Sequence, residues 1–420
     1  MYCQMMRGVY LRCNGEMACY CGSGNSITLG ELPLNDKNFC FVKDYYFNLK
    51  HQYVRDSFKK LTLPYPAACL RCIYLQPKLE TGLEKLHKEI EWMHIEATSQ
   101  CNLGCTFCIP LSERKSYRPP PLFLPVDLYK KIIDDIKVNK LTAEKMYFSG
   151  IGEPGLHKNI WDMVAYAKDL LETNFLVNTN GNIAYTDSIV HCGLDKIKIA
   201  IDGIDQRTYE KYRCHGKLSK ILKLTESISK YKKRLGKNNP TIIWQYIIFS
   251  HNDSIEELVQ FQKMAIDLGV DEILFKTTFT MDIYSKLDIN EIPKIHPNVN
   301  ILDIREMFTS NLNILSSMHE DFLTLKKNNN IKESIIRGID ISHNILMGFL
   351  LGFSSQKEYN LLGHDNNSLL ELIKDSKNSD DTFFKSKVEI LLSIFKNFVS
   401  LYQTIDQKEA SNYYKQFLDL

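Results

Sequence analysis

Residues Trp92-Met-His-Ile-Glu96 and then Ala-Thr-Ser-Gln-Cys101-Asn-Leu-Gly-Cys105-Thr-Phe-Cys108 decide the interpretation of this chain. The first five residues predict a strand, and beyond it three cysteines lie within a span of eight residues. A compact loop of this kind can ligate three irons of a cubane cluster and leave the fourth iron open. A zinc knuckle or a set of buried thiols uses the same residues, so the surrounding sequence has to distinguish them.

Outward from this loop, predicted strands alternate with helical patterns. The apolar periodicity of residues 160–172 and 255–268 predicts two of the helices. Strand followed by helix, repeated, predicts a parallel α/β fold, here a partial (β/α)6 TIM-like barrel. The expected strands are residues 92–96, 145–149, 175–178, 196–201, 242–248 and 272–276.

Three regions are expected along the chain. Residues 1–76 form a small cysteine-rich module, in which residues 8–13 and 16–21 flank the turn dipeptide Asn14-Gly15 and predict a β-hairpin. Residues 77–285 form the barrel, beginning with a linking helix over 78–91. Residues 286–420 show no clear strand, and their apolar patterns predict a helical C-terminal region.

Composition and charge narrow the class of protein. The 420 residues are 44% hydrophobic with a net charge of +2, which predicts folded domains and gives no electrostatic reason to expect nucleic acid or a membrane as a partner. Twelve cysteines cluster early in a chain whose first residues lack the pattern of a signal peptide. Metal ligation in the cytoplasm is therefore expected in place of disulfides.

The cysteine triplet resembles the CxxxCxxC signature of the radical S-adenosylmethionine (SAM) superfamily. The resemblance implies that Cys101, Cys105 and Cys108 hold a [4Fe-4S] cluster and that SAM chelates the open iron. It further implies that Phe107, before the last cysteine, packs near the adenine. Such enzymes cleave SAM reductively to a 5'-deoxyadenosyl radical, which abstracts a hydrogen atom from the substrate.

Four further segments match that family in order, and each follows a predicted strand, where an α/β barrel carries its functional loops. Gly150-Ile-Gly152-Glu153-Pro resembles the loop that binds the SAM amino group, and Asn178-Thr-Asn180-Gly resembles the TNG segment. Asp202-Gly is similar to the S-x-D-G segment, with Ala200 where serine is common. The resemblance gives Arg213 in Arg213-Cys-His-Gly a role in pairing with the SAM carboxylate.

A second metal site is expected in the N-terminal module. Cys69 and Cys72 form a tight pair, and Cys19 and Cys21 share one face of a strand. Spacing alone leaves tetrathiolate zinc and iron–sulfur open. The module resembles the first half of a SPASM or twitch domain, although it precedes the barrel, and this resemblance implies one auxiliary [4Fe-4S] cluster. Cys3 or Cys13 can replace Cys19 or Cys21 as a ligand.

The resemblance leaves the substrate open. A carbohydrate or glycoconjugate is favoured, with epimerisation or oxidation as the reaction and flavodoxin or ferredoxin as the electron donor. The alternatives are modification of a ribosomal peptide and a non-catalytic metal-binding scaffold. An epimerase needs a hydrogen-atom donor, and Cys214 is the candidate, against the plainer interpretation of an unligated thiol packed behind the SAM site.

Overall fold

The computed structural model describes residues 2–3, 7–19, 28–34, 36, 38–59, 75–76, 89–109, 112, 119–278 and 285–304. The expected helical region over residues 305–420 lies outside the described residues, as do Cys21, Cys69 and Cys72.

One ten-stranded sheet organises the described chain, in the order β12-β11-β10-β9-β8-β7-β6-β2-β3-β4. From β6 to β12 every neighbouring pair is parallel. These strands are β6 (Glu89–Ile95), β7 (Thr142–Phe148), β8 (Asn174–Thr179), β9 (Lys196–Ala200), β10 (Thr241–Ile247), β11 (Glu272–Lys276) and β12 (Val299–Leu302). The expected parallel α/β fold is confirmed, and each of the six expected strands overlaps one of them.

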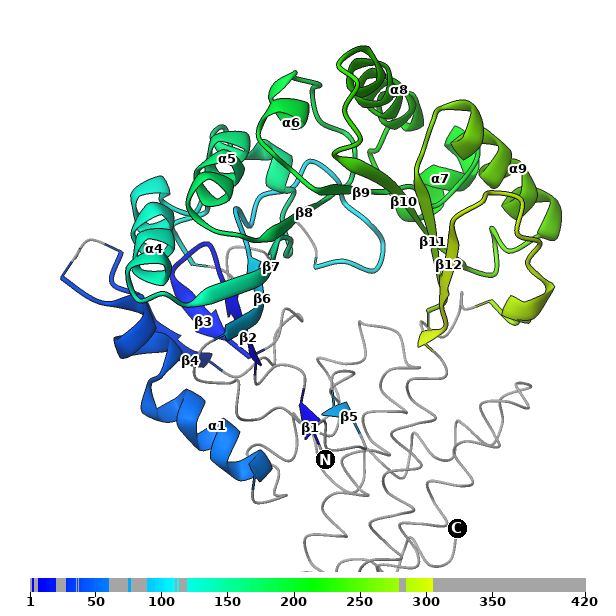
Figure 1. Ribbon diagram of the computed structural model, residues 1–420. Helices are drawn as coiled ribbons and strands as arrows, with labels where there is room; N and C mark the ends of the chain where they lie inside the picture. The colour runs from blue at the N-terminus through cyan, green and yellow to red at the C-terminus, as the bar shows by residue number, and fades with distance from the viewer. Residues whose placement is uncertain are drawn as a thin grey trace, which may run out of the picture.

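The strands form an arc with helices on its outer side, as in a barrel that does not close (Figure 1). The helices are α4 (Val126–Val138), α5 (Ile160–Leu170), α6 (Ser188–His191), α7 (Gln206–Tyr212), α8 (Leu218–Arg234) and α9 (Ile255–Asp267). Ser254 caps α9 by accepting a hydrogen bond from the Glu257 amide, a capping box that the sequence carries. Short 3-10 helices cover Pro154–Leu156 and Ile289–Glu291.

The strands of the barrel begin earlier and continue later in the chain than the sequence predicts. β12 pairs in parallel with β11, so the strand pattern continues beyond residue 286, where none was expected. Residues 89–91 belong to β6 and not to a linking helix, whose remaining part, 78–88, lies outside the described residues. β12 was missed because its four residues, Val-Asn-Ile-Leu, are too short for a clear period.

The N-terminal hairpin is present but does not stand apart from the barrel. β2 (Gly8–Leu11) and β3 (Glu16–Ala18) pair antiparallel across the expected turn, and β4 (Thr28–Glu31) adds a third strand. β2 also pairs in parallel with β6, so the hairpin continues the barrel sheet. The remaining N-terminal elements are β1 (Tyr2–Cys3), a π-helix over Phe41–Tyr46, α1 (Leu49–Lys59) and β5 (Leu75–Gln76), which pairs with β1.

The core lies between the sheet and the outer helices. Ile132 of α4, Val164 of α5, Ile228 of α8 and Phe261 of α9 are fully buried there. Strand residues alternate between this core and the concave side. In β9 Ile197 and Ile199 are buried, while the alternate residues Lys196, Lys198 and Ala200 are only partly buried. The concave side is therefore free to carry polar groups.

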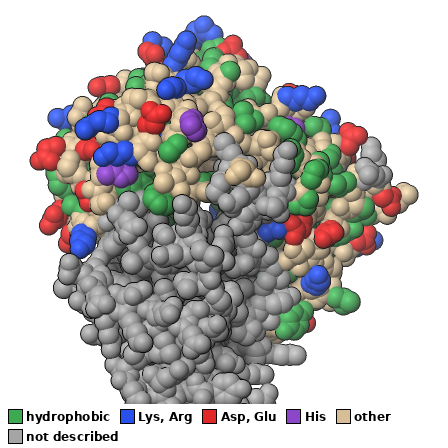
Figure 2. All heavy atoms as spheres, turned by 180° about the vertical axis from the view of Figure 1, so that it is seen from behind, with side chains coloured by type: hydrophobic (Ala, Val, Ile, Leu, Met, Phe, Trp, Pro, Cys, Tyr) green, Lys and Arg blue, Asp and Glu red, His purple; other side chains and the backbone are tan. Residues whose placement is uncertain are grey.

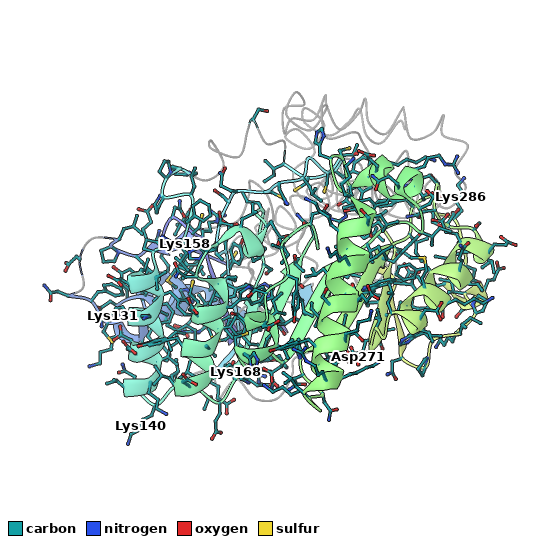
Figure 3. All side chains as sticks on the ribbon, turned by 90° about the horizontal axis from the view of Figure 1, so that it is seen from above. Lys131, Lys140, Lys158, Lys168, Asp271 and Lys286 are labelled. Carbon is teal, nitrogen blue, oxygen red and sulfur yellow. The ribbon has the colours of Figure 1, made fainter. Side chains whose placement is uncertain are left out.

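Seen from behind, the described surface carries acidic and basic side chains side by side, with apolar ones between them (Figure 2). Figure 3 places Lys131 and Lys140 at α4, on the outer side of the sheet. Within the described part of the chain no helix has the length and apolar character needed to cross a bilayer.

Gly8 fixes how closely β2 approaches β6. A Cβ atom at Gly8 would lie 1.9 Å from Cε2 of Trp92, its partner on β6. We expect Gly8→Ala to lower the free energy of unfolding by about 1–3 kcal/mol, the usual cost of overpacking. Thermal unfolding followed by circular dichroism measures the shift in Tm. The control is Gly236→Asn, because Gly236 has a φ of +62° and no atom within 4 Å of an added Cβ. Equal Tm values for Gly8→Ala and the wild type would contradict the assigned register.

Candidate functional site

A cavity of about 290 Å³ opens at the carboxyl ends of the parallel strands, where a barrel of this kind carries its functional loops. It brings together the three cysteines of the loop after β6, the glycine-rich loop after β7, the segment after β8 and the side chain of Arg213. These four segments are separated in the sequence by up to 112 residues, from Cys101 to Arg213. The expectation that they meet is therefore supported by their common cavity.

Cys101, Cys105 and Cys108 line one side of this cavity. The side-chain nitrogen Nδ2 of Asn180 lies 3.6 Å from Cys101 Sγ, and Arg213 Nη1 lies 3.7 Å from Cys105 Sγ. Burial raises the pKa of Cys105, Arg213 offsets part of this effect, and the other two thiols add to it. A buried thiol beside two others becomes a stable thiolate when a metal compensates its charge.

The donor set fits a cubane cluster better than a single ion. Among the described residues, no three His, Cys, Asp or Glu side chains converge on one ion position. In a cubane each cysteine binds a different iron, so the thiols need not converge on one point. The three thiols lining one cavity are compatible with that arrangement.

The glycine-rich loop passes very close to the end of β6. A Cβ at Gly152 would lie 2.0 Å from the Thr98 carbonyl oxygen, and the Glu153 amide donates a 2.7 Å hydrogen bond to the Gln100 carbonyl. Only glycine leaves room for this approach. The contact fixes the loop directly beside the first cysteine.

Glu153 holds the loops after β7 and β8 together. Its side chain is 2% exposed, and it accepts hydrogen bonds from the Asn180 amide at 2.6 Å, the Thr179 hydroxyl at 2.7 Å and the Gly155 amide at 2.9 Å. Burial raises the pKa of Glu153, and these donors offset part of that rise. The carboxylate was expected to contact SAM; three of its acceptor positions are taken by the chain itself.

Asp202 and Arg213 form a buried ion pair at the edge of the cavity. Arg213 Nε lies 2.5 Å from Asp202 Oδ2, and Asp202 Oδ1 accepts a 2.6 Å hydrogen bond from the Ile247 amide. Burial works to lower the pKa of Arg213, but the Asp202 carboxylate and neighbouring groups hold it well above its ordinary value. Arg213 lines the cavity, whereas Asp202 is absent from its lining and lies behind Arg213.

Phe107 belongs to an aromatic cluster beside the cysteines. Its ring stacks on Tyr212 at 5.9 Å between centroids and lies 6.2 Å from Phe249. Tyr212 lines the cavity, and Phe107 does not. The guanidinium carbon of Arg213 lies 4.6 Å from the centroid of the Tyr212 ring. The aromatic ring therefore stabilises the positive charge of Arg213.

Glu96, at the end of β6, links the N-terminal hairpin to the glycine-rich loop. It is fully buried and accepts hydrogen bonds from Tyr10 Oη at 2.9 Å and the Ile151 amide at 3.2 Å. Cys13 Sγ lies 3.4 Å from its other oxygen. Cys13, one of the alternative auxiliary ligands, is thus buried against the barrel, while Cys19 is partly exposed and the Cys3 backbone pairs with Leu75.

Cys214 lies outside the cavity lining. Its Sγ is 3.7 Å from the Glu210 carbonyl and 3.5 Å from the Thr106 hydroxyl. This position favours the interpretation of a thiol packed behind the site over that of a hydrogen-atom donor.

Sequence reasoning missed the polar groups deeper in the barrel. Lys198 of β9, Gln245 of β10 and Lys276 of β11 line the same cavity as the cysteines. The signal was available, because β9 reads Lys-Ile-Lys-Ile-Ala, whereas strands covered by apolar groups on both faces read as continuous apolar runs. The alternation marks the concave side as polar.

Comparisons with known proteins agree with the site. Residues 95–265 match the Radical SAM superfamily. The tungsten-containing aldehyde ferredoxin oxidoreductase cofactor-modifying protein of Pyrococcus furiosus is 25% identical over 191 residues, which cover 44% of this chain and 51% of that protein. GTP 3',8-cyclase of Staphylococcus haemolyticus is 24% identical over 228 residues, 50% of this chain and 66% of that protein.

Among solved structures, Streptococcus suis SuiB bound to S-adenosylmethionine is 13% identical with a TM-score of 0.38, covering 72% of this chain and 73% of that one. The chain spans from about half to two thirds of the length of the two curated relatives. The matched region, 95–265, contains the cysteine triplet, the glycine-rich loop and Arg213. Residues 95–265 are therefore a radical SAM domain, and the cofactors of that superfamily are a [4Fe-4S] cluster and SAM.

Proposed function

We propose that this chain uses a 5'-deoxyadenosyl radical to abstract a hydrogen atom from a polar, sugar-bearing substrate, with epimerisation or oxidation as the outcome. The observation that carries the proposal is the single cavity that joins three cysteines to polar side chains on β8, β9, β10 and β11. A polar lining suits a ligand rich in hydroxyl groups.

The cluster, once bound by Cys101, Cys105 and Cys108, supplies the electron that cleaves SAM. The chain's own part is to bind and orient. Arg213, held by Asp202 at 2.5 Å, presents a fixed positive charge beside Cys105 for the SAM carboxylate. The backbone of Gly150, Ile151 and Gly152 lines the cavity where the SAM amino group is expected.

The N-terminal module would carry an auxiliary [4Fe-4S] cluster on Cys19, Cys21, Cys69 and Cys72. Cys19 lies one residue beyond β3, in the hairpin whose other strand, β2, pairs with β6. We place the enzyme in the cytoplasm with flavodoxin or ferredoxin as electron donor, without a nucleic-acid or membrane partner.

Replacement of Cys101, Cys105 and Cys108 together by Ala is expected to abolish formation of 5'-deoxyadenosine, because no thiolate remains for the SAM-binding cluster. Anaerobic iron and sulfide analysis should fall from about eight irons per chain to about four, as expected for the loss of one of two cubanes. The electron paramagnetic resonance signal of the auxiliary cluster should persist.

Cys192→Ala is the matched control, since Cys192 is buried beside Ile189, away from the cavity. This variant should keep the iron content of the wild type and should still form 5'-deoxyadenosine. Zinc in place of iron in the wild type, with no SAM cleavage, would refute the proposed function. Loss of all cluster absorbance in the triple variant would refute the auxiliary cluster alone.

Glu153→Gln is expected to weaken SAM binding by about 10- to 100-fold. The substitution replaces an acceptor by an amide and leaves one of the Asn180 and Thr179 donors unmatched, a loss of about 1.5–3 kcal/mol for bonds to a charged group. Isothermal titration of the reconstituted protein with SAM under anaerobic conditions measures the change in Kd.

Glu226→Gln is the control, because Glu226 forms only an exposed ion pair with Lys230 on α8 and should bind SAM as the wild type does. An unchanged Kd in Glu153→Gln would show that the loops after β7 and β8 do not form the SAM site.

A further inference from the structure

Two lysines occupy the wall of the cavity beyond the cysteines. Lys198 and Lys276 both line it, together with Asn178 and Gln245. Asn178 and Lys198 are direct cross-strand partners on β8 and β9, and side chains at such positions lie about 5 Å apart at Cβ. Positive charge and amide groups thus share one wall.

This wall lies deeper in the barrel than the thiols. Asn180, which contacts Cys101 Sγ, is two residues farther along the chain than Asn178. Asn178 lies within β8, whereas Asn180 lies in the loop just beyond the carboxyl end of that strand. The wall is therefore formed by the strands themselves, whereas the three cysteines lie in the loop beyond the carboxyl end of β6.

Lys198 faces a cavity whose described negative groups already have partners. Glu153 is the one carboxylate of the described cavity lining, and it accepts three hydrogen bonds from the chain. The cysteines are assigned to the cluster, and Arg213 already faces Cys105. Within the part of the chain that the structure describes, Lys198 has no hydrogen-bond or ion-pair partner.

The pKa values of Lys198 and His94 are both lowered by burial and in part by the charge of a nearby lysine. Burial, followed by the charge of Lys276, lowers the pKa of Lys198 to about 7. Burial, followed by the charge of Lys198, lowers the pKa of His94 to about 4, so His94 is neutral and adds no charge. Among the described residues Asn178 Oδ1 is buried with no hydrogen-bond donor facing it, which is costly unless a ligand supplies a donor.

We propose that the substrate carries an anionic group, a phosphate or carboxylate, which binds between Lys198 and Lys276, and a neighbouring hydroxyl group that donates to Asn178. The inference rests on the proposed function in taking SAM to occupy the cysteine end of the cavity. It narrows the substrate from a sugar in general to an anionic one, such as a sugar phosphate or a sugar acid.

The test is acetylation of lysines in the reconstituted wild-type protein, followed residue by residue by mass spectrometry. An amine with a pKa near 7 is about half deprotonated at pH 7, so Lys198 should react faster than ordinary surface lysines. A bound anion favours the protonated form and covers the amine. Glucose 6-phosphate and inorganic sulfate should each slow acetylation of Lys198 at least tenfold at saturation, and SAM alone should slow it less than twofold.

The charge of sulfate is constant between pH 6 and 8.5, so its affinity should fall as the pH rises and Lys198 loses its proton. Lys276→Met should cut the protection by sulfate at least threefold, since one of the two cations is removed. Lys196→Met is the matched control: Lys196 lies on the same strand, 45% exposed and paired with Glu272, and protection of Lys198 should be unchanged.

Acetylation of Lys198 that neither anion slows would overturn the proposal, and so would protection by SAM alone, which would make Lys198 a partner of the SAM carboxylate. Undiminished protection in Lys276→Met would exclude the paired site. A wild-type protein that protects Lys198 with sulfate but never cleaves SAM would refute the proposed function and leave the anion site standing.

Discussion

One buried carboxylate holds the site together. Glu153 is a single side chain, yet its two oxygens bind donors from the loops after β7 and β8. A buried charge with this many donors is stable where it lies, and removing a partner leaves an uncompensated group. The close approach of Gly152 to Thr98 extends the same constraint to the cysteine loop. The positions of Cys101, the glycine-rich loop and Asn180 are thus mutually dependent.

Much of the barrel could be predicted because its signals are local. The strand over residues 272–276 has the predicted bounds, and the helix beginning at Ile255 ends one residue earlier than the pattern indicated. Apolar periodicity and the Asn14-Gly15 turn are both patterns of neighbouring residues. The cysteine triplet and the glycine-rich loop were found in the same way, and the cavity brings both together.

The partners of these residues could not be predicted, because they are set by packing between distant segments. Asp202 carries a motif that suggested a ligand contact, but its carboxylate faces Arg213 and the Ile247 amide. Cys13 was named only as an alternative metal ligand, and nothing in the sequence indicated that its thiol lies 3.4 Å from Glu96. Lys198 was overlooked although its strand alternates between apolar and polar residues. The alternation does not tell which face of the strand lies on the concave side, because the curvature of the sheet decides that.

Pairing of β2 with β6 has a consequence for how the chain is made. Tyr10 and Glu96 are hydrogen-bonded across 86 residues of sequence, so during synthesis the first hairpin leaves the ribosome long before its partner strand exists. At about 5–20 residues per second the delay lasts several seconds, and contacts between distant segments form slowly in any case. During that interval the edge of β2 is open to pairing with another chain. The yield of folded protein should therefore depend on the rate of translation and on chaperones that shield this hairpin.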